Sequence, residues 1–166
     1  GILDDGALFS LFESGETADH LTDIVERCVA FKAQIVEADE TETGVRKTLN
    51  LGHTAGHAIE RCSDYSIPHG HAVAIGLAII ARASERLGWA TEPIARRVEH
   101  ALMRNGLPTT TSFTPEALAE AALSDKKRAG GQITLVVPKK IGECVLADLP
   151  MEQLLDVFRA GMVAGA

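Results

Sequence analysis

Residues 69–88, HGHAVAIGLAIIARASERLG, constrain the fold more than any other segment, because the first half is apolar on every side of a helix. A helix at the surface keeps a polar face, whereas a helix without one has to be surrounded by other elements. The chain has 166 residues, which is enough for one domain with a sizeable core. The sequence therefore predicts a single, mainly α, bundle-like domain over residues 1–166, with this helix inside it.

A second helix is predicted to begin near Thr17. Steps of four, three and four residues place Leu21, Val25, Cys28 and Lys32 on one helical face. A lysine at the end of an apolar row is unexpected. Its long stem can lie on apolar surface while its charge reaches water. The alternative is that this lysine has a role in a functional site.

Two later helices show patterns typical of helix starts. Thr91 is a candidate N-cap for one, and Thr114, followed by Pro115 at the first helical position, is a candidate for the other. The strands that we expect are QITLVV and ECVLAD, which flank PKKIG in a short hairpin. A last helix is predicted from residue 151, with apolar residues at helical spacing.

The formal net charge of −7 disfavours nonspecific binding to nucleic acid or to an anionic membrane. An anionic small molecule can still bind where basic residues gather in one cleft. The three cysteines show no CxxC spacing, which is typical of reduced thiols in a cytoplasmic protein. We expect no signal peptide, and the longest apolar run, residues 72–81, is far shorter than the roughly 20 residues of a membrane span.

Four of the six histidines lie within residues 49–76. On a helix, His53 and His57 are one turn apart and project from the same face. His69 begins the next predicted helix, and packing of the two helices can bring it beside His53. Zinc favours imidazole nitrogens, and a catalytic zinc keeps one position open. An HxxxH pair alone is a weak pattern, however, and histidines also cap helices or bind buried carbonyl groups.

Two polar residues precede this pair at the same spacing. If the helix extends far enough back, Arg46 and Asn50 form one polar stripe with His53 and His57. Arginine in such a stripe can hold a phosphate or carboxylate through two parallel hydrogen bonds. The alternative is a solvated face, but the glycines around His53 favour a close approach of backbone or ligand.

The segments KAQIVEADETETGVRKTLNLGHTAGHAIE, HGHAVAIG and DKKRAGGQITLVVPKKIG resemble, in order and spacing, the C-terminal half of 3-dehydroquinate synthases, in the sugar-phosphate cyclase superfamily. The resemblance covers nearly the whole chain. It implies a helical C-terminal domain with a small hairpin. It also implies a lyase that converts 3-deoxy-D-arabino-heptulosonate 7-phosphate to 3-dehydroquinate and phosphate in the shikimate pathway. Zn²⁺ or Co²⁺ would be bound in this half, and NAD in an N-terminal domain.

The resemblance also implies roles for individual residues. His53 and His69 would be metal ligands. His57, Lys32 and Arg46 would be catalytic. The residues that would contact the sugar phosphate are Lys32, Arg46, Asn50, His57, Lys126 and Lys127. The lysine that closes the apolar row would then point into the site.

The chain departs from the family pattern in three places. The third ligand, a glutamate in an AExxK segment, and the NAD-binding half would lie upstream of residue 1, so we expect the chain alone to be inactive. His71 stands where the family usually has a glutamate, which would accept a hydrogen bond from the second ring nitrogen of a metal-binding histidine. Ala55 stands where an aromatic residue is usual, and would leave extra room near the site.

Several alternatives stand beside this interpretation. Within the superfamily, the chain resembles 2-deoxy-scyllo-inosose and valiolone synthases through the same residues. A metal-dependent polyol dehydrogenase would share the two-domain architecture. A non-catalytic helical binding module is the alternative from another class. We expect the full-length enzyme to be a homodimer with a small-molecule substrate.

Overall fold

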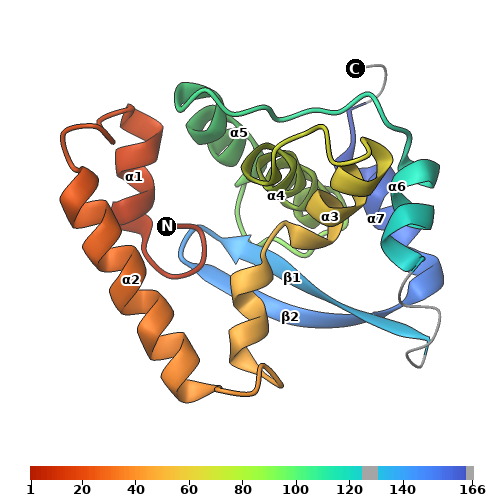
Figure 1. Ribbon diagram of the computed structural model, residues 1–166, viewed down its shortest axis with the longest axis horizontal. Helices are drawn as coiled ribbons and strands as arrows, with labels where there is room; N and C mark the ends of the chain where they lie inside the picture. The colour runs from red at the N-terminus through yellow and green to blue at the C-terminus, as the bar shows by residue number, and fades with distance from the viewer. Residues whose placement is uncertain (125–130, 164–166) are drawn as a thin grey trace.

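The computed structural model describes residues 1–124 and 131–163, and helix α4 (His69–Arg86) runs through its centre (Figure 1). Most positions between 72 and 84 are buried. Helices α3 (His53–Cys62), α5 (Ala95–Arg104) and α7 (Leu154–Gly161) pack around α4. The prediction of a mainly α domain built around this apolar helix is confirmed.

Strand β1 also packs against α4, and the hairpin runs beneath α3 and α4 in the view of Figure 1. β1 (Gln132–Lys140) and β2 (Glu143–Pro150) are antiparallel. The predicted hairpin is confirmed, but its turn takes only Ile141 and Gly142, the last two residues of PKKIG. The expected strand QITLVV ends at Val137, whereas β1 continues through Pro138. A two-stranded sheet has only edge strands, where proline is tolerated.

The N-terminal helices form an arm at one side of the molecule (Figure 1). α1 (Gly6–Ser14) packs on α5, whereas α2 (Leu21–Ala38) contacts the short 3-10 helix η1 (Val45–Asn50). α2 begins four residues after the predicted start. Its apolar row does not face the core, since Leu21 is 62% exposed and Val25 is 52% exposed.

The two predicted caps had different outcomes. In α6 (Pro115–Leu123), the Thr114 hydroxyl accepts a hydrogen bond from the Ala117 N–H at 3.2 Å, as predicted. At α5 the prediction was wrong, because Thr91 donates to the Lys139 carbonyl instead. The first N–H groups of α5 donate to the Glu85 carboxylate, which reaches over from α4. A carboxylate from a neighbouring helix therefore replaces the local cap.

The chain ends in a short 3-10 helix, η3 (Met151–Gln153), followed by α7. Leu154, Val157 and Phe158 of α7 are buried against the central helix and the hairpin. Among the described residues, no helix combines the length and the apolar character needed to cross a membrane.

Candidate functional site

Helices α3 and α4 approach each other at three glycines. A Cβ atom added to Gly76 on α4 would lie 2.1 Å from the Gly52 carbonyl oxygen, so only glycine fits there. Gly52 precedes α3 and has a φ of +79°, in the left-handed region that favours glycine. A Cβ atom added to Gly56 would lie 3.2 Å from the backbone of Val73 on α4, a less severe contact. The first turn of α3, with its histidines, is thereby held directly against α4.

Three histidines meet where these helices begin. The ring centroids of His53 and His57 lie 5.4 Å apart, and that of His69 on α4 lies 5.3 Å from His53 and 5.9 Å from His57. The predicted meeting of two helices that carry imidazoles therefore occurs in the structure. Three rings at this spacing can direct their nitrogens toward one point.

Two of these rings have a hydrogen-bond partner at Nδ1. His53 Nδ1 lies 3.2 Å from the carbonyl oxygen of Leu51. His69 Nδ1 lies 3.0 Å from Oε1 of Glu60, which is on α3. Both contacts leave Nε2 of the ring available to another partner.

The donor atoms suit a divalent transition metal. One donor atom each from His57, Glu60 and His69 lie within 4.8 Å of one another, and His53 borders this group. Imidazole and carboxylate are donors that Zn²⁺ and Co²⁺ accept. His71 is exposed, and among the described residues it is not a member of the group.

The surroundings of His57 favour the uncharged form of its ring. Burial, followed by the nearby charge that His53 can carry, lowers the pKa of His57 below its ordinary value. Glu60 acts in the opposite direction with a smaller effect. His57 is therefore neutral at neutral pH and can accept a proton.

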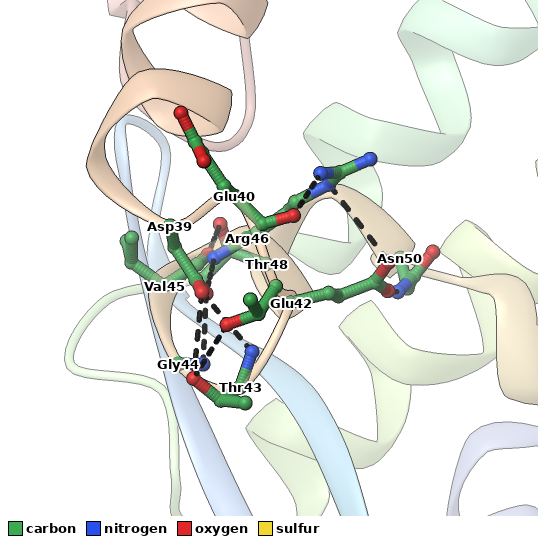
Figure 2. Close-up of polar contacts among 10 residues, drawn as sticks. Asp39, Glu40, Glu42, Thr43, Gly44, Val45, Arg46, Thr48 and Asn50 are labelled. Carbon is green, nitrogen blue, oxygen red and sulfur yellow. Dashed lines mark hydrogen bonds and ion pairs between the residues drawn. The ribbon is translucent and has the colours of Figure 1, made fainter.

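A loop before α3 is ordered by one carboxylate (Figure 2). Asp39 accepts hydrogen bonds from the backbone N–H groups of Thr43, Gly44 and Arg46, at 3.1, 2.8 and 3.0 Å. These bonds hold the pKa of Asp39 below its usual range, and the bond from the Arg46 N–H has the largest effect. The loop therefore has a defined conformation that leads into η1.

The predicted polar stripe from Arg46 to His57 is not one helix face. Arg46 and Asn50 belong to η1, and Gly52 breaks the chain before α3 starts at His53. The Arg46 guanidinium donates to the Glu40 carbonyl at 2.9 Å, and the Asn50 amide donates to the Glu42 carboxylate at 2.8 Å (Figure 2). Asn50 and His53 nevertheless reach the same hollow from the two elements.

This hollow has a volume of about 560 Å³ and lies between η1, α3 and β1. Its lining residues are Glu42, Lys47, Asn50, His53, Thr54, His57, Gln132, Ile133, Thr134 and Val136. The sequence interpretation missed Glu42 and Lys47, although both lie in the segment that carries the resemblance. Lys47 supplies a positive charge to this wall.

Other predicted site residues lie elsewhere. Lys32 is exposed on α2, and neither it nor Arg46 is among the described residues that line the hollow. Lys126 and Lys127 lie outside the described residues. Ala55 is buried, and the cavity beside it measures only about 20 Å³, room for about one water molecule.

Comparison with known proteins supports a family assignment. Residues 1–128 match the family described as 3-dehydroquinate synthase C-terminal. The 3-dehydroquinate synthase of Pelobacter propionicus is 43% identical in an alignment of 163 residues that covers 93% of this chain. That stretch is 45% of the relative, so the chain spans under half the length of the curated relative it matches.

Solved structures share the fold at lower identity. The 2-epi-5-epi-valiolone synthase of Streptomyces hygroscopicus subsp. jinggangensis 5008, with NAD⁺ and Zn²⁺ bound, superposes with a TM-score of 0.80 at 21% identity. The match covers 95% of this chain and 47% of that one. A 2-deoxy-scyllo-inosose synthase complexed with carbaglucose-6-phosphate, NAD⁺ and Co²⁺ gives a TM-score of 0.67 at 20% identity, over 87% of this chain and 42% of that one.

Proposed function

Because this chain belongs to the 3-dehydroquinate synthase family, we propose that it is the metal- and substrate-binding part of an enzyme that makes 3-dehydroquinate. The substrate is 3-deoxy-D-arabino-heptulosonate 7-phosphate, and phosphate is the second product. One observation carries the proposal: histidines from α3 and α4 meet beside a hollow that Asn50 and Lys47 also line. The identity above 40% to a 3-dehydroquinate synthase favours this reaction over that of valiolone synthases.

His53 and His69 hold the metal ion in this proposal. Their Nδ1 atoms already have partners in Leu51 and Glu60, so each ring can offer Nε2. A Zn²⁺ or Co²⁺ ion held there would supply Lewis-acid chemistry, which polarises a substrate oxygen and makes a neighbouring proton easier to remove. Tight binding needs a third protein ligand, which we assign to a segment upstream of residue 1 together with the domain that binds NAD.

The hollow holds the sugar phosphate in this proposal. Its volume suits a small, polar molecule, and Lys47 and Asn50 offer a charge and an amide to phosphate or hydroxyl oxygens. Arg46 and Lys32 act from the neighbouring η1 and α2, and Lys126 or Lys127 from the segment after α6. Local basic residues of this kind allow an acidic chain to bind an anion.

His57 accepts or donates a proton on the substrate. It lines the hollow and stands next to both proposed ligands, at 5.4 Å from His53 and 5.9 Å from His69. Its lowered pKa keeps the ring neutral near pH 7, which is the form that can act as a base. Lys32 and Arg46 neutralise charge on the reacting sugar phosphate.

The whole enzyme is a cytoplasmic homodimer in this proposal, and residues 1–166 alone are inactive.

Isothermal calorimetry with zinc tests the metal centre in the 166-residue chain, beside His53→Ala and His69→Ala. We expect one zinc to bind weakly and both substitutions to abolish binding. A folded chain that binds no zinc, even with the upstream segment restored, refutes the metal centre.

Substrate identity needs the protein encoded by the complete reading frame. Supplied with NAD and zinc, it should release phosphate from 3-deoxy-D-arabino-heptulosonate 7-phosphate and form 3-dehydroquinate. The sugar phosphate that valiolone synthases use, offered in parallel, tests the valiolone alternative. Turnover of that second sugar alone would reassign the chain within the superfamily.

A further inference from the structure

Glu60 is a carboxylate to which the proposed chemistry gives no role of its own. It lies on α3, three residues after His57, and its side chain is only 13% exposed. A carboxylate in such a position costs free energy unless a hydrogen bond compensates it. Its Oε1 lies 3.0 Å from Nδ1 of His69, so this contact joins α3 to the first residue of α4.

The contact fixes where the proton of His69 resides. An ionised carboxylate can only accept a hydrogen bond, so a neutral His69 ring carries its proton on Nδ1 and keeps the lone pair of Nε2. The Leu51 carbonyl acts in the same way on His53. Metal-binding histidines almost always donate the second ring N–H to a carboxylate, carbonyl or water. Both proposed ligands therefore have the partner that this arrangement requires.

We propose that Glu60 is a positioning residue of the metal centre, which holds the His69 ring in the orientation and tautomer in which Nε2 can bind the ion. The inference rests on the proposed function, because it takes His69 as a ligand. Direct ligation by Glu60 is the competing possibility, since its oxygen and donors of His57 and His69 lie within 4.8 Å. The hydrogen bond to Nδ1 favours positioning, because that oxygen already accepts from the ring.

This role also bears on His71, which stands where the family usually has a supporting glutamate. His71 is exposed on α4, and among the described residues the carboxylate that reaches His69 comes from α3. His69 therefore keeps a carboxylate partner, Glu60, although the family's usual glutamate at position 71 is replaced by histidine. We expect His71→Glu to leave the His69 tautomer unchanged.

The test compares the chain with Glu60→Ala, Glu60→Gln and a control, Glu152→Gln, at an exposed glutamate of η3. Long-range ¹H–¹⁵N spectra of the metal-free protein show which nitrogen of His69 is protonated, and calorimetry gives the zinc Kd. Thermal unfolding establishes that each variant is folded. We expect Glu60→Ala to weaken zinc binding about 10–100-fold and to shift His69 away from the Nδ1–H tautomer. Glu60→Gln, whose amide oxygen can still accept, loses less.

Three results overturn the proposal. The first is a Glu60→Ala variant with unchanged zinc Kd, whatever its tautomer. The second is an unchanged tautomer in that variant. The third is a loss of zinc as complete as in His69→Ala, because Glu60 is then a ligand. If the unsubstituted chain binds no zinc even with the upstream segment restored, the proposed function fails separately, and the tautomer in the metal-free protein still decides whether Glu60 orients His69.

Discussion

Substituting Gly76 with alanine should destabilise the fold and the histidine cluster together. The added Cβ would lie 2.1 Å from the Gly52 carbonyl oxygen and 3.0 Å from the Gly56 nitrogen, and both contacts are backbone atoms that cannot rotate away. Overpacking a core costs about 1–3 kcal/mol, and a clash with backbone belongs at the upper end. A loss of about 3 kcal/mol lowers the Tm of a domain of this size by about 6–12 °C.

Differential scanning calorimetry measures this loss, and Gly70→Ala is the matched control. Gly70 lies on the same helix, and a Cβ there meets no atom within 4 Å. Alanine at an open helical position is neutral or slightly stabilising, so its Tm should match or exceed that of the unsubstituted chain. Gly56→Ala, with contacts of 3.2 Å to Val73, should fall between the two. A Gly76→Ala variant as stable as Gly70→Ala would refute the close approach of α3 and α4.

Three further predictions concern titration, thiol reactivity and the hydrogen bonds of the buried Arg82. In NMR titration of the metal-free chain, His57 should have a midpoint below about 6.5, because burial disfavours its charged form. Since its folded pKa is lowered, its contribution to stability is present above pH 6.5 and is lost as the pH falls through the folded value. Exposed Cys28 should react with a thiol reagent at pH 8 well before Cys144, whose pKa burial raises to about 12, and equal rates contradict this. Arg82→Met should lower the urea unfolding free energy by about 3 kcal/mol, because it removes the bond to Glu99 at 2.6 Å and leaves the carbonyls of Gly161 and Thr109 without their donor. A change below about 1 kcal/mol contradicts this network.

The meeting of the histidines could be predicted because its causes are local. His53 and His57 share a face through helical spacing, and a connection of six residues, 63–68, makes α3 and α4 neighbours. The glycines at 52, 56 and 76 signal a close approach in the sequence itself. The burial of α4 could also be predicted, because a helix that is apolar on every side has to be surrounded by other elements.

The role of Glu60 could not be predicted, because it depends on where one turn of α4 lies relative to α3. Its spacing of three from His57 indicates only that it shares that face. The same limit applies to the α5 cap, where Glu85 acts from another helix. Thr91 is of a residue type that often caps helices, but tertiary packing places the Glu85 carboxylate at the start of α5, where it accepts the N–H bonds instead.

Helix α2 shows a different limit. Periodicity identifies the row of Leu21 and Val25 as one face, and it says nothing about what covers that face. In the described structure this row is exposed, and α2 contacts η1 instead. An apolar row at helical spacing therefore predicts a helix, but it does not predict that the same chain buries this row.

The broken stripe has a consequence for how the site works. A continuous helix would fix the distance between the anion-binding side chains and the histidines through its own hydrogen bonds. Here Gly52 separates them, so Asn50 is positioned by the loop that Asp39 orders, whereas His53 is positioned by the packing of α3 on α4. Disturbing the Asp39 loop should then impair substrate binding and leave zinc binding intact. The proposed metal centre and the proposed anion site are thus supported by different parts of the fold, and residues of both line one hollow.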